Sequence, residues 1–227
     1  MNTLDQTLGQ LARDIPGATG VFHAHQLDFC CGGQHSLREA ASRKGLDGTA
    51  IAARLEALRA DPADADTADW SREPLGRLID HVLARFHTRH REQLPELIRL
   101  ALRVEQVHAA HPDCPAGLAD HLRDMQQELE SHMQKEEDVL FPILAMGQGA
   151  RAGAPITVMR MEHEQHGQAL ARLDALTHDA TPPAGACTTW RALYAGLRTL
   201  REDLMEHIHL ENNILFERAA AGEPAHA

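Results

Sequence analysis

Two segments of the chain, residues 132–141 and 207–216, repeat the pattern H-x₃-E-x₃-L-F. A histidine and a glutamate four positions apart on a helix lie one turn apart on the same face, so both can bind one metal ion. The repeat therefore predicts that both segments are helical. It also gives each helix a candidate metal-binding face.

Apolar residues around both copies predict that this face is buried. They form two helical stripes, Leu118, Leu122, Met125, Leu129, Met133 and Leu140 in the first segment and Leu193, Leu197, Leu200, Leu204, Ile208 and Leu215 in the second. At roughly 100° per residue, His132 and Glu136 fall within the first stripe, and His207 and Glu211 fall within the second. A buried carboxylate needs a partner or loses its charge. The stripes therefore predict metal ions in the core.

Two other segments supply histidines with H-x₂-H spacing. The pairs are His87 with His90 and His163 with His166. The chain thus reads as two related helical hairpins, each giving one histidine from its first helix and an H-x₃-E from its second. Four histidines and two glutamates suit two iron ions with an oxide or hydroxide bridge. Zinc accepts the same ligands but favours four-coordinate sites.

The choice between His87 and His90 stays open at this point. The stripe on their own helix is Leu75, Leu78, Ile79, Val82 and Phe86, and it places His90 nearer its centre than His87. The repeat also cannot decide between the two histidines, because both have counterparts in the His163–His166 pair.

Helical periodicity and breaks predict an all-α chain. Four amphipathic segments, at about 74–110, 115–146, 155–178 and 188–221, point to an antiparallel four-helix bundle. Residues 1–60 read as a small helical N-terminal domain and 61–73 as an acidic linker, so the bundle covers 74–221. Pro95 is expected to kink the first bundle helix.

Charge and composition exclude several partners. The formal net charge of −11 lacks the basic character that nucleic-acid binding needs, and it disfavours an anionic membrane surface. No run of about 18 apolar residues could span a membrane. The N-terminus does not resemble a secretory signal, and four cysteines do not form a disulfide framework. A cytoplasmic protein is expected.

These residues resemble a known family, the iron-sulfur cluster repair di-iron proteins or Repair of Iron Centres group. The resemblance covers nearly the whole chain and is carried by Asp28–Gly33, Arg89–Leu97, Ser131–Glu137, Ala186–Trp190 and His209–Phe216. It implies a hemerythrin-like bundle behind an N-terminal domain of the ScdA type. The family's iron ligands correspond to His87, His132, Glu136, His163, His207 and Glu211, with both glutamates bridging two non-haem ions.

The resemblance also decides for His87 over His90 and adds two residues. Family glutamates near the centre, implicated in activity or iron access, correspond to Glu128 and Glu162. We expect them to act as channel or outer-shell residues.

Cys30 and Cys31 form a second candidate site. Adjacent cysteines make a strained disulfide at best. The two thiols are either idle or a soft-ligand site that passes iron from the bundle to a client.

Three functions fit this pattern. The first is a stress response in which donated iron repairs iron-sulfur clusters damaged by oxidation or nitric oxide, with the damaged proteins as clients. The second is enzymatic reduction of nitric oxide to N₂O. The third is a carrier or sensor of O₂ or NO, and assembly into a homodimer is left open.

Overall fold

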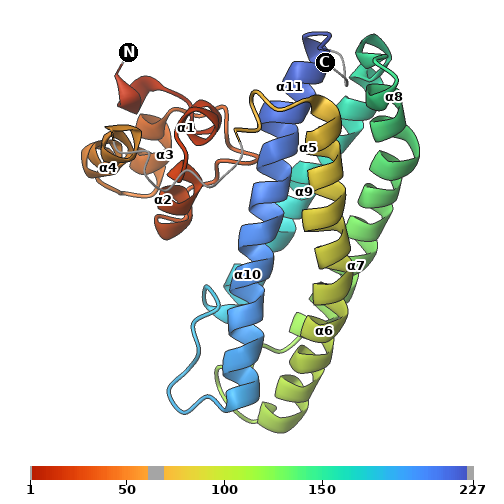
Figure 1. Ribbon diagram of the computed structural model, residues 1–227. Coiled ribbons are helices and arrows are strands. Elements are labelled where there is room, and N and C mark those ends of the chain that lie inside the picture. The colour runs from red at the N-terminus through yellow and green to blue at the C-terminus, as the bar shows by residue number, and fades with distance from the viewer. Residues whose placement is uncertain (1, 61–68, 224–227) are drawn as a thin grey trace. The chain divides into compact units, whose positions relative to one another are not determined.

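The computed structural model of the chain describes residues 2–60 and 69–223. Within these ranges no residue forms a strand, and the one extended contact is an isolated antiparallel bridge between Thr7 and Ser36. The prediction of an all-α chain is confirmed (Figure 1). Residues 61–68 of the expected linker lie outside the described residues. Among those described, no helix is long and apolar enough to cross a membrane.

Residues 2–60 fold into short helices around their own apolar core. The elements are η1 (Thr3–Asp5), α1 (Leu8–Asp14), α2 (Ala18–Ala24), α3 (Leu37–Arg43) and α4 (Gly48–Ala60). Thr7 and Ser36 cap α1 and α3 with capping boxes, in which the side-chain oxygens of Gln10 and Glu39 accept a hydrogen bond from the backbone N–H of the cap residue. The core of these helices includes Leu8, Leu11, Phe22, Phe29, Leu37 and Leu55.

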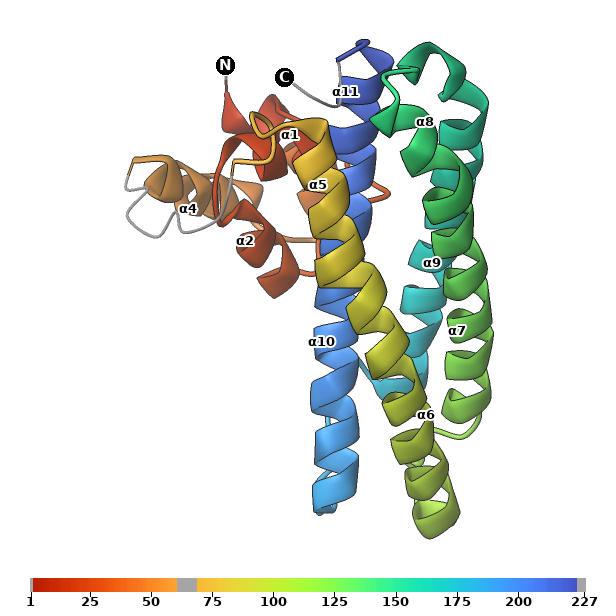
Figure 2. The ribbon, with the colours of Figure 1, turned by 45° about the vertical axis from the view of Figure 1, so that its right-hand side comes forward.

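Residues 69–223 form four long helical runs with short connections. Their elements are α5 (Leu75–Val82), η2 (Leu83–His87) and α6 (Thr88–His108); α7 (Leu118–Lys135), η3 (Glu136–Leu140) and α8 (Phe141–Ala145); η4 (Gly149–Arg151) and α9 (Gly153–Thr177); and α10 (Thr188–Leu210), η5 (Glu211–Leu215) and α11 (Phe216–Ala220). Figures 1 and 2 both show α6, α7, α9 and α10 running side by side. Pro95 lies inside α6, which continues through it.

The residues of both predicted apolar stripes are buried. Leu122 and Leu129 of α7 and Leu197 and Leu200 of α10 are at most 2% exposed. The inward phase inferred for α7 and α10 is therefore confirmed. This burial is the main source of the bundle's stability, because the free energy gained grows with the apolar area removed from water.

The chain divides into two compact units. The first comprises Met1–Ile79, Ile143–Gly153 and Met205–Ala227, and the second comprises Asp80–Pro142 and Ala154–Leu204. Most of the four long helices belong to the second unit, whereas the first contains the N-terminal helices and the last turns of α10. The boundaries expected from the sequence, at 60 and 74, stay a prediction.

Candidate metal centre

Three of the six expected ligands lie at π-helical turns. His87 ends η2, Glu136 begins η3 and Glu211 begins η5. Turns of this kind hold an extra residue, and they occur frequently at functional sites. In both copies of the repeat the π-turn covers the segment E-x₃-L, so the two copies share a backbone shape as well as a sequence.

The second unit brings four expected ligands together. His87, His132, Glu136 and His163 are all at most 1% exposed. One oxygen of Glu136 lies 3.3 Å from Nε2 of His87, and its other oxygen lies 3.4 Å from Nε2 of His132. The Nε2 atoms of His132 and His163 are 3.1 Å apart. Glu136 therefore presents one carboxylate oxygen to each of two histidines.

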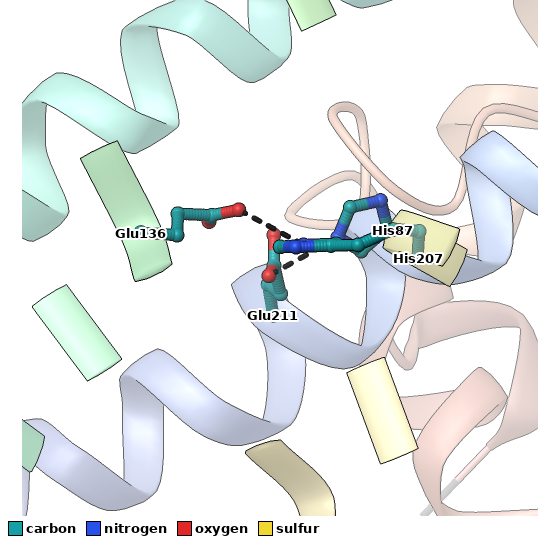
Figure 3. Close-up of side chains that lie close together, drawn as sticks. All are labelled: His87, Glu136, His207 and Glu211. Carbon is teal, nitrogen blue, oxygen red and sulfur yellow. Dashed lines mark ion pairs between the residues drawn. The ribbon is translucent and has the colours of Figure 1, made fainter. Parts of the chain in front are cut away.

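The last turns of α10 and η5 carry the remaining two ligands. Oε1 of Glu211 lies 3.2 Å from Nε2 of His207, and both side chains are fully buried. Two groups of potential ligand atoms result, each with all its atoms within 4.8 Å of one another, namely His87, Glu136, His207 and Glu211, and His132, Glu136, His163 and Glu211. Figure 3 shows the first group with its two ion pairs. Both glutamates belong to both groups.

The chemistry of these side chains fits a pair of cations. Imidazole nitrogens and carboxylate oxygens are the donors that non-haem iron accepts in proteins. Two carboxylates buried beside each other repel, and burial without a counter-charge is costly. Cations bound between these side chains would offset both effects, and Glu136 and Glu211 belong to both ligand groups.

A carboxylate outside the first group fixes the orientation of His87. Oε1 of Glu137 lies 2.7 Å from Nδ1 of His87. Because an ionised carboxylate can only accept, the proton of this bond lies on Nδ1, and Nε2, which faces Glu136, is the nitrogen available to a metal ion. Arg91 donates to both oxygens of Glu137 and to both oxygens of Glu130.

The charges of this cluster are strongly paired. Partial burial raises the pKa of Glu137, but hydrogen bonds with Arg91 and His87 outweigh it and hold the pKa below its ordinary value. Hydrogen bonds to Glu130 and Glu137 raise the pKa of Arg91. The sequence did not reveal Glu137 as a functional residue, since its position lies off the apolar stripe. The signal that could have identified it is the Glu136-Glu137 doublet.

Glu162 orients His132 in the same way. Its Oε2 lies 2.9 Å from Nδ1 of His132, and its Oε1 pairs with Lys135. Partial burial raises the pKa of Glu162, but the bonds with Lys135 and His132 outweigh it, so that the pKa is lowered. Glu128, the other expected outer residue, is exposed on α7 and belongs to neither ligand group.

The second histidine of each H-x₂-H pair is buried without joining a ligand group. His90 is fully buried, lines a cavity of about 420 Å³ with Arg91 and Met133, and is outside both groups. His166 stacks edge-on against His132 at 5.0 Å between ring centroids. The structure thus brings His87, rather than His90, to the ligand cluster. The extra residue of η2 shifts the helix face relative to a phase counted at 3.6 residues per turn, and His87 as the iron ligand stays a prediction.

A buried aspartate of α10 secures the segment that carries His87. Asp203 is 5% exposed and accepts hydrogen bonds from Arg85 at 2.7 Å, Arg89 at 2.8 Å and Gln93 at 3.0 Å. Partial burial raises the pKa of Asp203, but these three bonds lower it further than burial raises it. Arg85 and Arg89 flank His87, so the contact restrains η2 and the start of α6.

The loop between α2 and α3 holds the two adjacent thiols. The sulfurs of Cys30 and Cys31 are 3.8 Å apart, and Oδ1 of Asp28 accepts from both cysteine N–H groups. The three side chains form a third group of potential ligand atoms. Hydrogen bonding with Cys31 and burial raise the pKa of the Cys30 thiol well above its ordinary value.

Two asparagines next to Glu211 contact this loop. Asn212 donates to the carbonyl oxygen of Cys30 at 3.2 Å, and Asn213 donates to that of Phe29 at 3.1 Å. Gly33 packs so closely that a Cβ atom there would lie 3.0 Å from Oδ1 of Asn213. The thiol loop is therefore bonded directly to the π-turn that begins with a predicted iron ligand.

Comparison with known proteins matches both parts of the chain. Residues 78–219 match the hemerythrin HHE cation binding domain, and residues 4–59 match ScdA_N, a domain of unknown function. The iron-sulfur cluster repair protein YtfE of Yersinia pseudotuberculosis serotype IB is 51% identical over 223 residues, which is 98% of this chain and 100% of that protein. YtfE of Yersinia pestis, strain Pestoides F, has the same identity and coverage. With this identity over nearly its full length and a hemerythrin cation-binding domain over most of its helices, the chain belongs to the family of the iron-sulfur cluster repair proteins.

Proposed function

We propose that the protein repairs iron-sulfur clusters by donating iron from a centre of two non-haem ions. The observation that carries the proposal is the pair of buried ligand groups that share Glu136 and Glu211. A cluster repair protein must supply iron, and these groups have the donors to hold two ions of it. The names of the relatives support repair rather than nitric oxide reduction.

The ligands have distinct roles in this proposal. His87 and His207 hold one ion, and His132 and His163 hold the other. Glu136 would be shared between the two ions, since each of its oxygens faces a histidine of a different group. Glu211, the first residue of η5, belongs to both ligand groups and would be shared as well, with an oxide or hydroxide as a further ligand. Six protein ligands shared between two ions leave coordination positions open for a small ligand such as O₂ or NO.

The thiol loop is the proposed route of delivery. Thiolate sulfur is a soft ligand, and two sulfurs 3.8 Å apart with the Asp28 carboxylate can hold an iron ion in transit. Because the pKa of Cys30 is raised, its thiol keeps its proton until a metal ion displaces it. The bond between Asn212 and Cys30 keeps the loop next to the π-turn of Glu211.

The outer carboxylates support the ligands. Glu162 positions His132 through their hydrogen bond, and this contact supports the outer-shell role proposed for Glu162. The channel role of Glu128 stays a prediction, as do the homodimer and the cytoplasmic location. Clients in this proposal are iron-sulfur proteins damaged by oxidative or nitrosative stress.

Metal analysis and a repair assay test the proposal together. Anaerobic reconstitution should give two iron ions per chain in the native protein and should leave Glu211→Ala depleted, because a bridging carboxylate contacts both ions. Glu202→Ala is the matched control, since Glu202 is an exposed glutamate of α10, the helix that precedes η5. Loaded native protein should restore the activity of aconitase damaged by nitric oxide. A failure to restore it, or equal restoration by depleted Glu211→Ala, would refute the donation of iron.

A further inference from the structure

The two expected metal positions have unequal outer support. Each position contains a histidine whose Nδ1 is bonded to a carboxylate, His87 to Glu137 and His132 to Glu162. Each carboxylate is in turn bonded to a cation. The two positions have the same kind of arrangement, but the cation is an arginine at one and a lysine at the other.

His87 is supported by a network of three charged side chains, Glu137, Arg91 and Glu130. Arg91 of α6 makes four hydrogen bonds, two to Glu137 of η3 and two to Glu130 of α7, at 2.9–3.3 Å. Gln134 donates a further bond to Glu130. A planar guanidinium bonded to two carboxylates fixes the direction of both, because its donors have a rigid geometry.

The segment around His87 is restrained on a second side. Arg85 and Arg89, two positions before and after it, both donate to the buried carboxylate of Asp203. With the backbone held by Asp203, the ring of His87 can leave a metal ion only by breaking its bond to Glu137, a carboxylate that Arg91 holds in place. A movement of the whole segment would instead break the bonds of Arg85 and Arg89 to Asp203.

The support of His132 is simpler, because one carboxylate, that of Glu162, is held by one lysine. Among the described residues Glu162 bonds to His132 and Lys135. Lys135 is 45% exposed, and its ammonium group is a hydrated point charge on a flexible chain. Glu162 itself is 19% exposed, so the solvated end of this pair is the lysine, and water can replace its ammonium group at little cost. Glu162 and His132 can then move together.

We propose that the ion held beside His132 and His163 leaves first and is the ion that the protein donates, whereas the ion beside His87 stays longer. The statement that this ion is donated rests on the proposed function. The order in which the two ions leave concerns the metal centre alone. Glu137 and Arg91 are positioning residues here, because they act on the metal through His87.

Extraction of iron by a chelator measures the order. Reduced, iron-loaded protein is mixed with an excess of the ferrous chelator bathophenanthroline disulfonate, and the coloured complex is followed in time. The native protein should release iron in two phases of equal amplitude. Loss of an outer carboxylate typically weakens metal affinity by about 10-fold or more, so Glu162→Gln should accelerate the first phase by about that factor and leave the second unchanged.

Substitutions of the cations complete the assignment. Lys135→Ala should accelerate the first phase only, and Arg91→Lys, which keeps the charge but loses the fork, should accelerate the second phase until the phases merge. Lys44→Ala and Arg99→Lys are matched controls, because Lys44 caps α3 and Arg99 forms an exposed pair with Glu96 on α6. Both controls should leave the two phases as in the native protein.

The outcomes separate the proposals. A single phase in the native protein would show that the two positions are equivalent, and acceleration of the first phase by Arg91→Lys would reverse the order. Either result overturns the inference. Protein stopped after the first phase should retain one ion and restore aconitase more slowly than fully loaded protein. Two phases with the expected responses, but no restoration of aconitase by loaded protein, would refute donation and leave the order of release standing.

Discussion

Replacing Asp203 by asparagine should destabilise the bundle although the residue is not a metal ligand. Its carboxylate accepts bonds from Arg85, Arg89 and Gln93 while being almost fully buried. Arg85 donates to Oδ1, whereas Arg89 and Gln93 donate to Oδ2. Asparagine retains one acceptor oxygen and turns an NH₂ group toward the other donors, so at least one of the three bonds is lost or becomes repulsive.

The size of the stability loss depends on how exposed the partners of Asp203 are. Breaking a fully buried ion pair costs about 3–5 kcal/mol, and a bond to a charged group contributes about 1.5–3 kcal/mol. Both arginines are nearly half exposed, so water rehydrates them when the carboxylate is removed, and the cost is reduced. We expect a loss of about 2 kcal/mol in the free energy of unfolding, or about 4–8 °C in Tm for a chain of this length.

Thermal unfolding followed by circular dichroism measures the difference, and its dependence on pH identifies the cause. The pKa of Asp203 is lowered in the folded protein, so its stabilisation is present above the unfolded pKa of about 3.9 and is lost as the pH falls through the folded value. The difference in Tm between native protein and Asp203→Asn should therefore persist at neutral pH and shrink below about pH 4.

An exposed pair supplies the control for this experiment. Asp5→Asn removes a contact with Arg38 in which both side chains are more than half exposed, and it should change stability by less than about 0.5 kcal/mol. Equal effects of the two substitutions would refute the argument from burial. An Asp203→Asn difference that does not shrink in acid would show that the carboxylate's charge is not its source.

Two further predictions concern the assignment of the ligands and of the thiols. His87→Ala should lose iron, whereas His90→Ala should keep its iron and lose about 1–3 kcal/mol of stability, because it truncates a core side chain. If metal analysis finds iron loss only in His90→Ala, the phase of the apolar stripe was right. The double variant Cys30→Ala/Cys31→Ala should retain two iron ions per chain, because its ligands are elsewhere, yet restore damaged aconitase poorly. Full restoration by this variant would leave the thiols without a role in delivery.

The helical character and the inward face of the bundle could be predicted because they depend on local spacing. Apolar residues at helical period identify the buried side of α7 and α10, and the H-x₃-E pairs lie in that phase. The repeat then makes the two helices equivalent. A pattern on a single helix determines which residues share its face, so the proposed ligands Glu136 and Glu211 can be identified from the sequence.

The contacts between helices could not be predicted in the same way. Glu137 lies off the apolar stripe of its own segment, and only the position of η2 brings Nδ1 of His87 to 2.7 Å from Oε1 of Glu137. Asp203 precedes His207 by about one turn, and nothing in its spacing indicates three donors on another helix. The register of His87 depends on the π-turn η2, which a constant period of 3.6 residues does not represent.

The two copies of the repeat differ at the position after the glutamate, and this difference divides their tasks. Glu136 and Glu211 begin equivalent π-turns, so the next residue departs from the same backbone shape in both copies. In the first copy that residue is Glu137, whose carboxylate fixes the Nδ1 proton of His87. In the second copy it is Asn212, whose amide donates to the Cys30 carbonyl. An amide can donate to a backbone carbonyl and an ionised carboxylate cannot, so the glutamate suits a metal-facing histidine and the asparagine suits the thiol loop. In the proposed function, the duplicated motif would thus support the metal centre in one copy and contact the proposed delivery site in the other.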